Sequence, residues 1–217
     1  MTLHTFIRRA TPVLACLAGS WLAPSLAATA PKYIVQPVTE MKVKQLPRGP
    51  LYWHVENFPT LAQAKAAAAA VYPWNPDTVS NEGTPALAAE VAGKAWLFTL
   101  GPKGAAPAGG TKVTDVGPVP VVSAPEYLLR INYGHGAPEA RTPVHSHPGS
   151  ETFYVVAGRL GQRTLDGVSY VDAGHTMNGH VAGMPMEVFN AGTSELTALI
   201  MFVVDASKPF SVPAAFP

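Results

Sequence analysis

The sequence predicts an all-β fold, a barrel or a double-sheet sandwich, preceded by a less regular region with strands and one helix. Glycine and proline are frequent, with 19 and 22 copies in 217 residues, which favours turns and short strands over long helices. From Glu126 to Asp205, short apolar segments follow one another closely, and several end in a glycine turn. Hydrophobic residues make up 47% of the chain, so a buried core is expected.

Residues 1–27 are predicted to be a signal peptide. Two arginines precede an apolar stretch, and small residues near Ala27 and Ala28 fit a cleavage site. A membrane anchor is disfavoured because two prolines interrupt a short stretch, and a lipoprotein site at Cys16 is a minor alternative. Cys16 is the only cysteine, so the mature chain can fold in an oxidising compartment without disulfides. We expect a periplasmic or secreted protein with no stable membrane anchor after processing.

Residues 28–125 are predicted to form an extension packed on the main domain. Two aromatic-rich segments, 50–59 and 94–102, are typical of strands. Thr60 is expected to be the N-cap of an alanine-rich helix that ends before Pro73. No catalytic motif is found in this region.

Residues 126–205 are predicted to form the main all-β domain. Residues 206–217 form a proline-rich tail that is expected to run along the surface. The predicted strand segments, several of which end in glycine, are 126–134, 144–158, 160–167, 168–174, 183–192 and 195–205.

His145, His147 and Glu151 are the candidate metal ligands. Side chains two residues apart on a strand lie on one face, so the two imidazoles should project together. Glu151 has the same parity, and the intervening Pro-Gly-Ser can bend the chain so that the Glu151 carboxylate lies near the two imidazoles. Two imidazoles and one carboxylate suit a divalent transition metal. A polar strand entrance without function is the alternative, but the apolar segment that follows places the cluster at the mouth of a buried core.

These residues resemble the first motif of the cupin superfamily. His145, His147, Glu151 and Gly158 fit its His-x-His, Glu and Gly spacing without a gap. One departure is the loop before the first histidine, which is about three residues longer than usual, since Gly136 lies further upstream.

A second stretch, "GMPMEVFN", is similar to the second cupin motif. Gly183 and Asn190 match, Val181 stands where proline is usual, and Met186 stands where the family has its last histidine ligand. The resemblance covers roughly 126–205. It implies a single-domain, type 2-like jelly-roll β-barrel with a metal inside its mouth, and pairing into homodimers.

Met186 leaves the ligand set open. As a ligand, its thioether would favour copper, especially Cu(I). As a packing residue, which we prefer, it leaves a two-histidine, one-carboxylate set that suits non-haem iron. His180 is a third option, since it could replace the missing histidine, and His175 is a weaker one. Iron or manganese is favoured, with copper, zinc or nickel as alternatives.

Other side chains are expected around the metal by strand parity. Phe153, Val155 and Val188 would form an apolar pocket wall. Arg130 and Asn132 share one face of the preceding strand and are candidates for a polar contact, although that face could equally meet solvent.

Two functions remain open at this point. The first is a metal-dependent enzyme acting on a small organic molecule by oxygenase, isomerase or lyase chemistry. The second is a non-catalytic protein that binds a metal or small ligand, including copper through Met186. No catalytic acid or base is evident. A net charge of +1 without a run of Lys or Arg argues against nucleic acid as a partner.

Overall fold

The computed structural model describes residues 31–71 and 84–217. The predicted signal peptide, the residues directly after it and the end of the predicted helix therefore lie outside the described residues. Within the described residues, no helix is long and apolar enough to cross a membrane.

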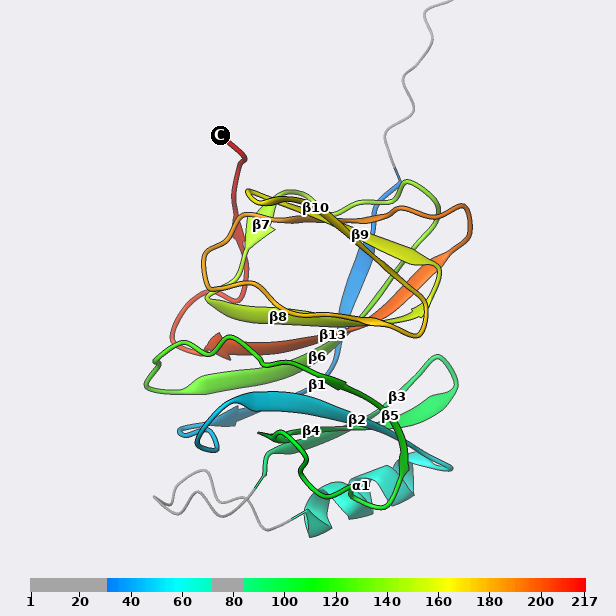
Figure 1. The fold of residues 1–217 in the computed structure, drawn as a ribbon, viewed down its shortest axis with the longest axis vertical. Helices are drawn as coiled ribbons and strands as arrows, with labels where there is room; N and C mark the ends of the chain where they lie inside the picture. The colour runs from blue at the N-terminus through cyan, green and yellow to red at the C-terminus, as the bar shows by residue number, and fades with distance from the viewer. Residues whose placement is uncertain (1–30, 72–83) are drawn as a thin grey trace, which may run out of the picture.

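The described chain forms three stacked sheets with one helix on the outside (Figure 1). The central sheet has five strands in the order β1-β6-β13-β8-β11. Its strands are antiparallel where they pair. They are β1 (Ile34–Val43), β6 (Tyr127–Gly136), β13 (Leu196–Asp205), β8 (Gly149–Ala157) and β11 (Thr176–Met177).

A three-stranded sheet faces one side of the central sheet and completes the jelly roll (Figure 1). Two short strands, β7 and β14, form a separate pair beside it. The all-β prediction is thus confirmed, as two facing sheets whose hydrogen bonds do not run continuously around a barrel. The strands are β10 (Gly167–Asp172), β9 (Arg159–Thr164), β12 (Glu187–Asn190), β7 (His145–Ser146) and β14 (Val212–Pro213).

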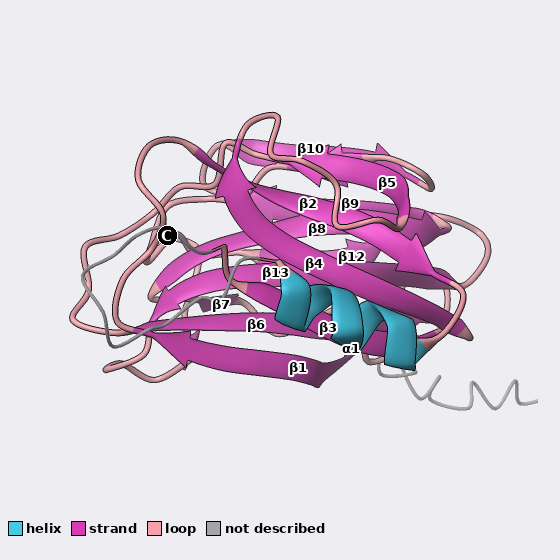
Figure 2. Ribbon diagram, turned by 90° about the horizontal axis from the view of Figure 1, so that it is seen from below, coloured by secondary structure: helices cyan, strands magenta, loops and turns pink. Residues whose placement is uncertain are grey.

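A four-stranded sheet covers the other side of the central sheet, with helix α1 (Leu61–Ala70) on its outer surface (Figure 2). The predicted N-cap is confirmed, because the Thr60 hydroxyl oxygen accepts a hydrogen bond from the Gln63 N–H at 3.2 Å. The predicted extension of strands and one helix is present. Its sheet has the order β3 (Ala86–Val91), β4 (Lys94–Pro102), β2 (Leu51–Phe58) and β5 (Thr111–Val116).

Strand β1 comes from the predicted extension but lies in the sheet of the main domain. It pairs with β6 from Ile34 opposite His135 to Val43 opposite Tyr127. The predicted boundary between residues 125 and 126 therefore separates two hydrogen-bonded neighbours. Pro37 lies at a register shift in β1, where an edge strand tolerates a residue without an N–H.

Strand β13, in the middle of the central sheet, is buried on both faces and takes part in two cores. On β13, Leu199, Met201 and Val203 face the inter-sheet core, which lies between the central and four-stranded sheets. Ile200 and Phe202 face the barrel core, inside the jelly roll. Burial on both faces explains why the β13 segment reads as a continuous apolar run.

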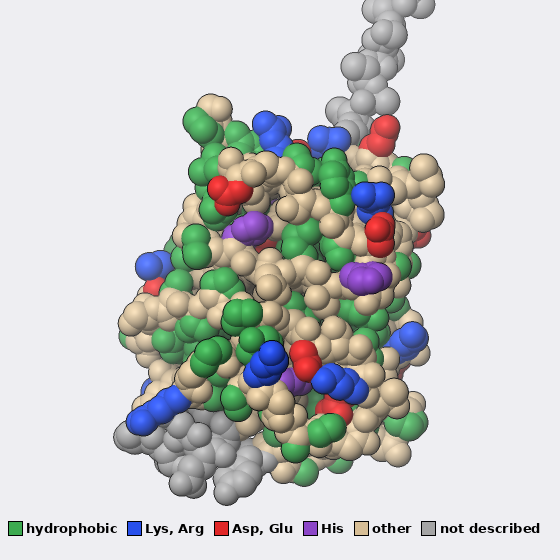
Figure 3. Space-filling view, in the orientation of Figure 1, with side chains coloured by type: hydrophobic (Ala, Val, Ile, Leu, Met, Phe, Trp, Pro, Cys, Tyr) green, Lys and Arg blue, Asp and Glu red, His purple; other side chains and the backbone are tan. Residues whose placement is uncertain are grey.

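The surface carries charges of both signs. On the face shown in Figure 3, acidic and basic side chains are interspersed, without a large patch of one sign. This distribution agrees with the small net charge of +1.

Candidate metal centre

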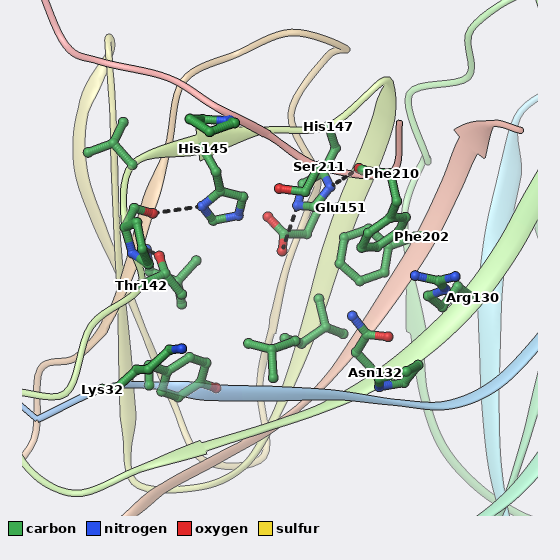
Figure 4. Close-up of a pocket in the computed structure, with 18 residues that line it drawn as sticks. Lys32, Arg130, Asn132, Thr142, His145, His147, Glu151, Phe202, Phe210 and Ser211 are labelled. Atoms are coloured by element: carbon green, nitrogen blue, oxygen red, sulfur yellow. Dashed lines mark hydrogen bonds and ion pairs between the residues drawn. The ribbon is translucent and has the colours of Figure 1, made fainter. Parts of the chain in front are cut away.

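The structure brings the three predicted ligands together. One ligand atom from each of His145, His147 and Glu151 lies within 4.8 Å of the others. His145 begins β7, His147 follows that strand, and Glu151 lies on β8 after a short turn. Figure 4 shows the three side chains near one another. His147 and Glu151 are buried, while His145 is partly exposed. The group therefore sits at the edge of the barrel core.

Both imidazoles are oriented by backbone carbonyls. Nδ1 of His145 is 2.9 Å from the Pro143 oxygen, and Nδ1 of His147 is 2.6 Å from the Phe210 oxygen. A carbonyl only accepts, so Nδ1 carries the hydrogen in each ring. Each Nε2 then has a free lone pair, as a metal-binding imidazole requires.

The carboxylate of Glu151 lacks the partners that a buried charge needs. Its Oε1 is 3.9 Å from Nε2 of His147, and its Oε2 has no hydrogen-bond partner. Burial raises the pKa of Glu151 to about 8. Burial also lowers the pKa of His147 to about 4, helped by the nearby His145 and Arg130 charges and opposed by the Phe210 hydrogen bond. Neutral imidazoles beside an unpartnered carboxylate fit a bound cation, which would offset the cost of burying the charge.

A cavity of about 500 Å³ lies against all three candidate ligands. This volume is in the range of small-molecule sites. Val188 forms part of its apolar wall, as strand parity predicted. Arg130 and Asn132 also line the cavity, as expected for the polar face of their strand. Phe153 and Val155 are buried in the barrel core but are not among the lining residues.

Tyr33 is a cavity residue that the sequence did not point to. It precedes β1, is only 2% exposed, and its hydroxyl has no hydrogen-bond partner. Burial, and then the Glu151 carboxylate, raise the pKa of Tyr33 above its usual value. A signal was present in β6, where Gly134 and Gly136 are two apart, since glycines in a strand often mark a close approach.

The C-terminal tail also forms part of the site. β14 pairs with β7, so the tail lies beside the strand that begins with His145. The Phe210 ring is 4.9 Å from the rings of both His147 and Phe202. The Arg130 guanidinium lies 4.2 Å from the centre of the Phe210 ring. The tail was predicted to run along the surface, and in the structure it also supplies the carbonyl that orients His147.

Met186 and His180 are joined to each other through Gln162. The Met186 sulfur accepts a hydrogen bond from Gln162 Nε2 at 3.4 Å, and Gln162 Oε1 is 2.6 Å from His180 Nε2. Met186 also exchanges two backbone hydrogen bonds with His145. Neither Met186 nor His180 is among the described residues that line the cavity. These contacts favour a packing role for Met186. His175 is exposed and its Nδ1 is 3.1 Å from the Ala173 oxygen.

The motif spacing and the strand arrangement can now be combined. The His-x-His and Glu residues open onto the interior of an antiparallel jelly roll, and the second motif runs through β12 opposite them. The barrel has the cupin fold. The resemblance predicted from the sequence is thereby confirmed at the level of the fold.

Solved structures similar to this chain include a lyase, a cupin-like protein and an oxidase. One is a DMSP lyase, 21% identical with a TM-score of 0.35, aligned over 40% of this chain and 44% of that chain. Another is a cupin-like protein from Thermotoga maritima, 17% identical with a TM-score of 0.36, aligned over 40% and 64%. A third is a recombinant oxalate oxidase in complex with glycolate, 26% identical with a TM-score of 0.34, aligned over 39% and 45%.

These similarities are partial. The alignments span less than two thirds of each of these three chains, from 44% to 64%. No protein-family model matches the chain, and no curated protein matches it either. With TM-scores this low, the function has to be inferred from this chain's own side chains.

Proposed function

We propose that this chain is a metal-dependent enzyme that acts on a small organic molecule, with His145, His147 and Glu151 as the metal ligands. The observation that carries the proposal is the position of these three side chains at the wall of a cavity of about 500 Å³. A two-histidine, one-carboxylate set leaves coordination positions open and suits Fe(II), with manganese as the second choice. When bound, such an ion supplies a Lewis acid or a redox centre.

The chain's own residues orient the site and give it an apolar wall. The Pro143 and Phe210 carbonyls fix the rings of His145 and His147. Phe202 and Phe210 pack against each other at 4.9 Å and form an apolar part of the cavity wall. Water is thereby excluded on that side, which strengthens electrostatic interactions inside the cavity. A small molecule bound there would lie against the metal ligands and an apolar wall at once.

A non-catalytic metal-binding protein is the alternative. Its copper-binding form requires Met186 as a ligand, but Met186 is not among the described residues that line the cavity, and its sulfur contacts Gln162. These contacts fit a packing role for Met186. We therefore place the enzyme proposal first.

Export and pairing also belong to this proposal. We expect the mature protein to begin near Ala28 in the periplasm or outside the cell, and N-terminal sequencing that finds Met1 would contradict this. A homodimer is supported by β1, a strand at the edge of the central sheet that exposes Ile34 and Val35. Light scattering during gel filtration measures the mass that decides between one copy and two.

Elemental analysis of the mature protein, purified from its native compartment, tests the metal proposal. We expect about one iron or manganese ion per chain, as a single site of this kind would hold. His145→Ala and His147→Ala should each remove it while the protein stays folded, because the two apolar cores supply the stability. His175→Ala is the matched control, since His175 is exposed and takes no part in the cluster.

Each outcome separates the proposals. Tightly held copper that depends on Met186 would favour the binding protein over the enzyme. Equal metal content in the His145 and His147 variants and in the control would show that the ligands are wrongly assigned. A protein that contains no metal and takes up none would refute metal-dependent catalysis.

A further inference from the structure

We propose that Tyr33 and Asn132 form a carboxylate-binding subsite in the cavity, so that the molecule bound beside the metal ligands is a small organic carboxylate. The inference rests on the proposed function, because it concerns the same cavity. It adds a ligand class and two binding residues that lie outside the metal cluster.

Tyr33 is held in place by the backbone of β6. A Cβ atom at Gly134 would collide with the Tyr33 hydroxyl oxygen, and one at Gly136 would lie 2.9 Å from its ring Cδ2. The ring therefore covers both glycines, with its hydroxyl at the Gly134 end. Asn132 is the next residue on that face of β6, so the hydroxyl points toward Asn132. The backbone N–H of Tyr33 donates to the Arg141 carbonyl oxygen at 3.1 Å, which fixes the backbone of Tyr33.

Both side chains keep unused hydrogen-bonding capacity although they are buried. Tyr33 is 2% exposed and its hydroxyl has no partner, and Asn132 is 3% exposed and its Oδ1 has no partner. Buried polar groups are nearly always paired, so the orphaned Tyr33 hydroxyl on the cavity wall indicates that a bound molecule completes it. The tyrosine O–H and the asparagine amide N–H groups can donate to a carboxylate, whereas the orphaned Asn132 Oδ1 only accepts and would take a donor such as a hydroxyl group of the same molecule.

The charges around the cavity favour an anion. Lys32 and Arg130 line it, and Glu151 is the only acidic residue among the described lining residues. Glu151 belongs to the metal cluster, and the Arg130 charge is shared with Glu40 at 2.6 Å. A ligand amine would meet two cations and no free carboxylate, whereas a ligand carboxylate meets donors and cations.

Asn132 and Arg130 lie across the site from His145, one of the candidate metal ligands (Figure 4). The cavity is also lined by apolar side chains, including Val188, Ile200 and Phe202. A ligand with a carboxylate, a short hydrocarbon part and a second functional group near the metal matches this lining.

Ligand titration followed by nuclear magnetic resonance tests the subsite. The probes are butyrate and its neutral analogue butyramide, added to the metal-loaded mature protein. The metal content of every sample is measured first, which keeps the metal proposal separate. Tyr33→Phe removes one hydroxyl and Asn132→Leu removes the amide. Tyr133→Phe is the matched control, because Tyr133 lies on the opposite face of β6 and packs against the inter-sheet core.

We expect butyrate to bind at least about tenfold more tightly than butyramide, because a hydrogen bond to a charged group typically changes the dissociation constant by about this factor or more. Tyr33→Phe should weaken butyrate binding about tenfold, and Tyr133→Phe should not change it. Metal content should be equal in all samples. Asn132→Leu should also weaken butyrate binding. If the Asn132→Leu protein does not fold, the conservative Tyr33→Phe variant alone tests the subsite.

Several results would overturn the subsite. Wild-type protein that does not bind butyrate, or binds butyramide equally well, excludes a carboxylate site. Unchanged butyrate affinity in Tyr33→Phe, with full metal content, excludes Tyr33 and leaves the metal proposal standing. Metal loss in Tyr33→Phe would assign that residue to the metal centre instead. If the wild-type protein holds no metal, the function proposal fails, and the same titration on metal-free protein still decides whether butyrate binding depends on Tyr33.

Discussion

The two faces of the central sheet support cores of different character. The inter-sheet core is filled by large apolar side chains, among them Trp53, Trp96 and Phe98, each at most 1% exposed. The barrel core, on the other face, borders a cavity and the cluster of His145, His147 and Glu151. Strand β13 contributes alternate residues to both. A sheet stabilised on one face can thus accommodate empty volume and buried ionisable groups on the other.

The largest effect should come from the inter-sheet core. Phe98→Ala leaves a cavity where a fully buried ring packed and should cost about 3–5 kcal/mol of unfolding free energy. Metal content should not change while the protein remains folded. Urea unfolding and elemental analysis measure the two quantities. A variant that keeps its stability but loses metal would show that the two faces are not separate in this way.

The tail should have the next largest effect, and on metal binding above all. A chain truncated after Pro209 lacks the Phe210 carbonyl that accepts from His147 Nδ1. Loss of such an orienting partner typically lowers metal affinity 10- to 100-fold. Competition with a chelator measures this loss.

Phe210→Ala is the control for the truncation, because it keeps the carbonyl and removes only the ring. A smaller loss than in the truncated chain is expected. Equal losses in both variants would indicate that ring packing against Phe202, and not the hydrogen bond, holds His147.

The metal-free protein should lose stability in mildly alkaline solution. In the folded protein the pKa of Glu151 is raised from 4.5 to about 8. The contribution of this group to the free energy of unfolding is therefore fully present below pH 4.5 and is lost as the pH rises toward 8. In the folded protein the pKa of His147 is lowered from 6.5 to about 4, so the stability that this group contributes increases as the pH rises from about 4 to 6.5. The two changes oppose each other up to pH 6.5. Above that pH only the loss from Glu151 remains, about 1–2 kcal/mol by pH 8.

Urea unfolding of metal-free protein at a series of pH values measures this decline. Glu151→Gln cannot ionise, so its stability should stay level across the same range. A decline of equal size in that variant would assign the effect to another group. Bound metal should also remove the decline, because the cation stabilises the ionised carboxylate.

The smallest effect should come from Met186. A leucine of similar volume should cost less than about 1.5 kcal/mol and leave metal identity and affinity almost unchanged. Met186→His should tighten binding of iron, manganese or zinc by adding a nitrogen donor. Metal titration of both variants checks this. A sharp loss of Cu(I) affinity in Met186→Leu, with the fold intact, would show that the thioether is a ligand.

The grouping of the three candidate metal ligands was predictable because they are close in sequence. His145, His147 and Glu151 lie on one turn and strand entrance, so their spacing alone placed them together. The strands of the jelly roll were predictable for a similar reason, since apolar segments and glycine turns are local signals. β1 was missed because Pro37 interrupts its pattern, and that residue is tolerated only because β1 lies at a sheet edge.

The rest of the site depends on contacts between distant segments. Tyr33 reaches the cavity through the pairing of β1 with β6, and Phe210 reaches His147 through the pairing of β14 with β7. No local pattern specifies either register. The position of Met186 was predicted, but its hydrogen bond from Gln162 follows from the packing of side chains on β9 and β12. The cavity residues contributed by the two ends of the described chain were therefore beyond a local analysis.

The hydrogen bond from His147 to Phe210 also sets an order of events in the folding of the molecule. Its acceptor follows β13 in the chain, whereas the buried residues of both cores all precede it. A growing chain can therefore complete β13 and bury both cores before the Phe210 carbonyl reaches His147. His147 acquires its fixed orientation last, so we expect a metal ion to bind to a barrel that has already folded.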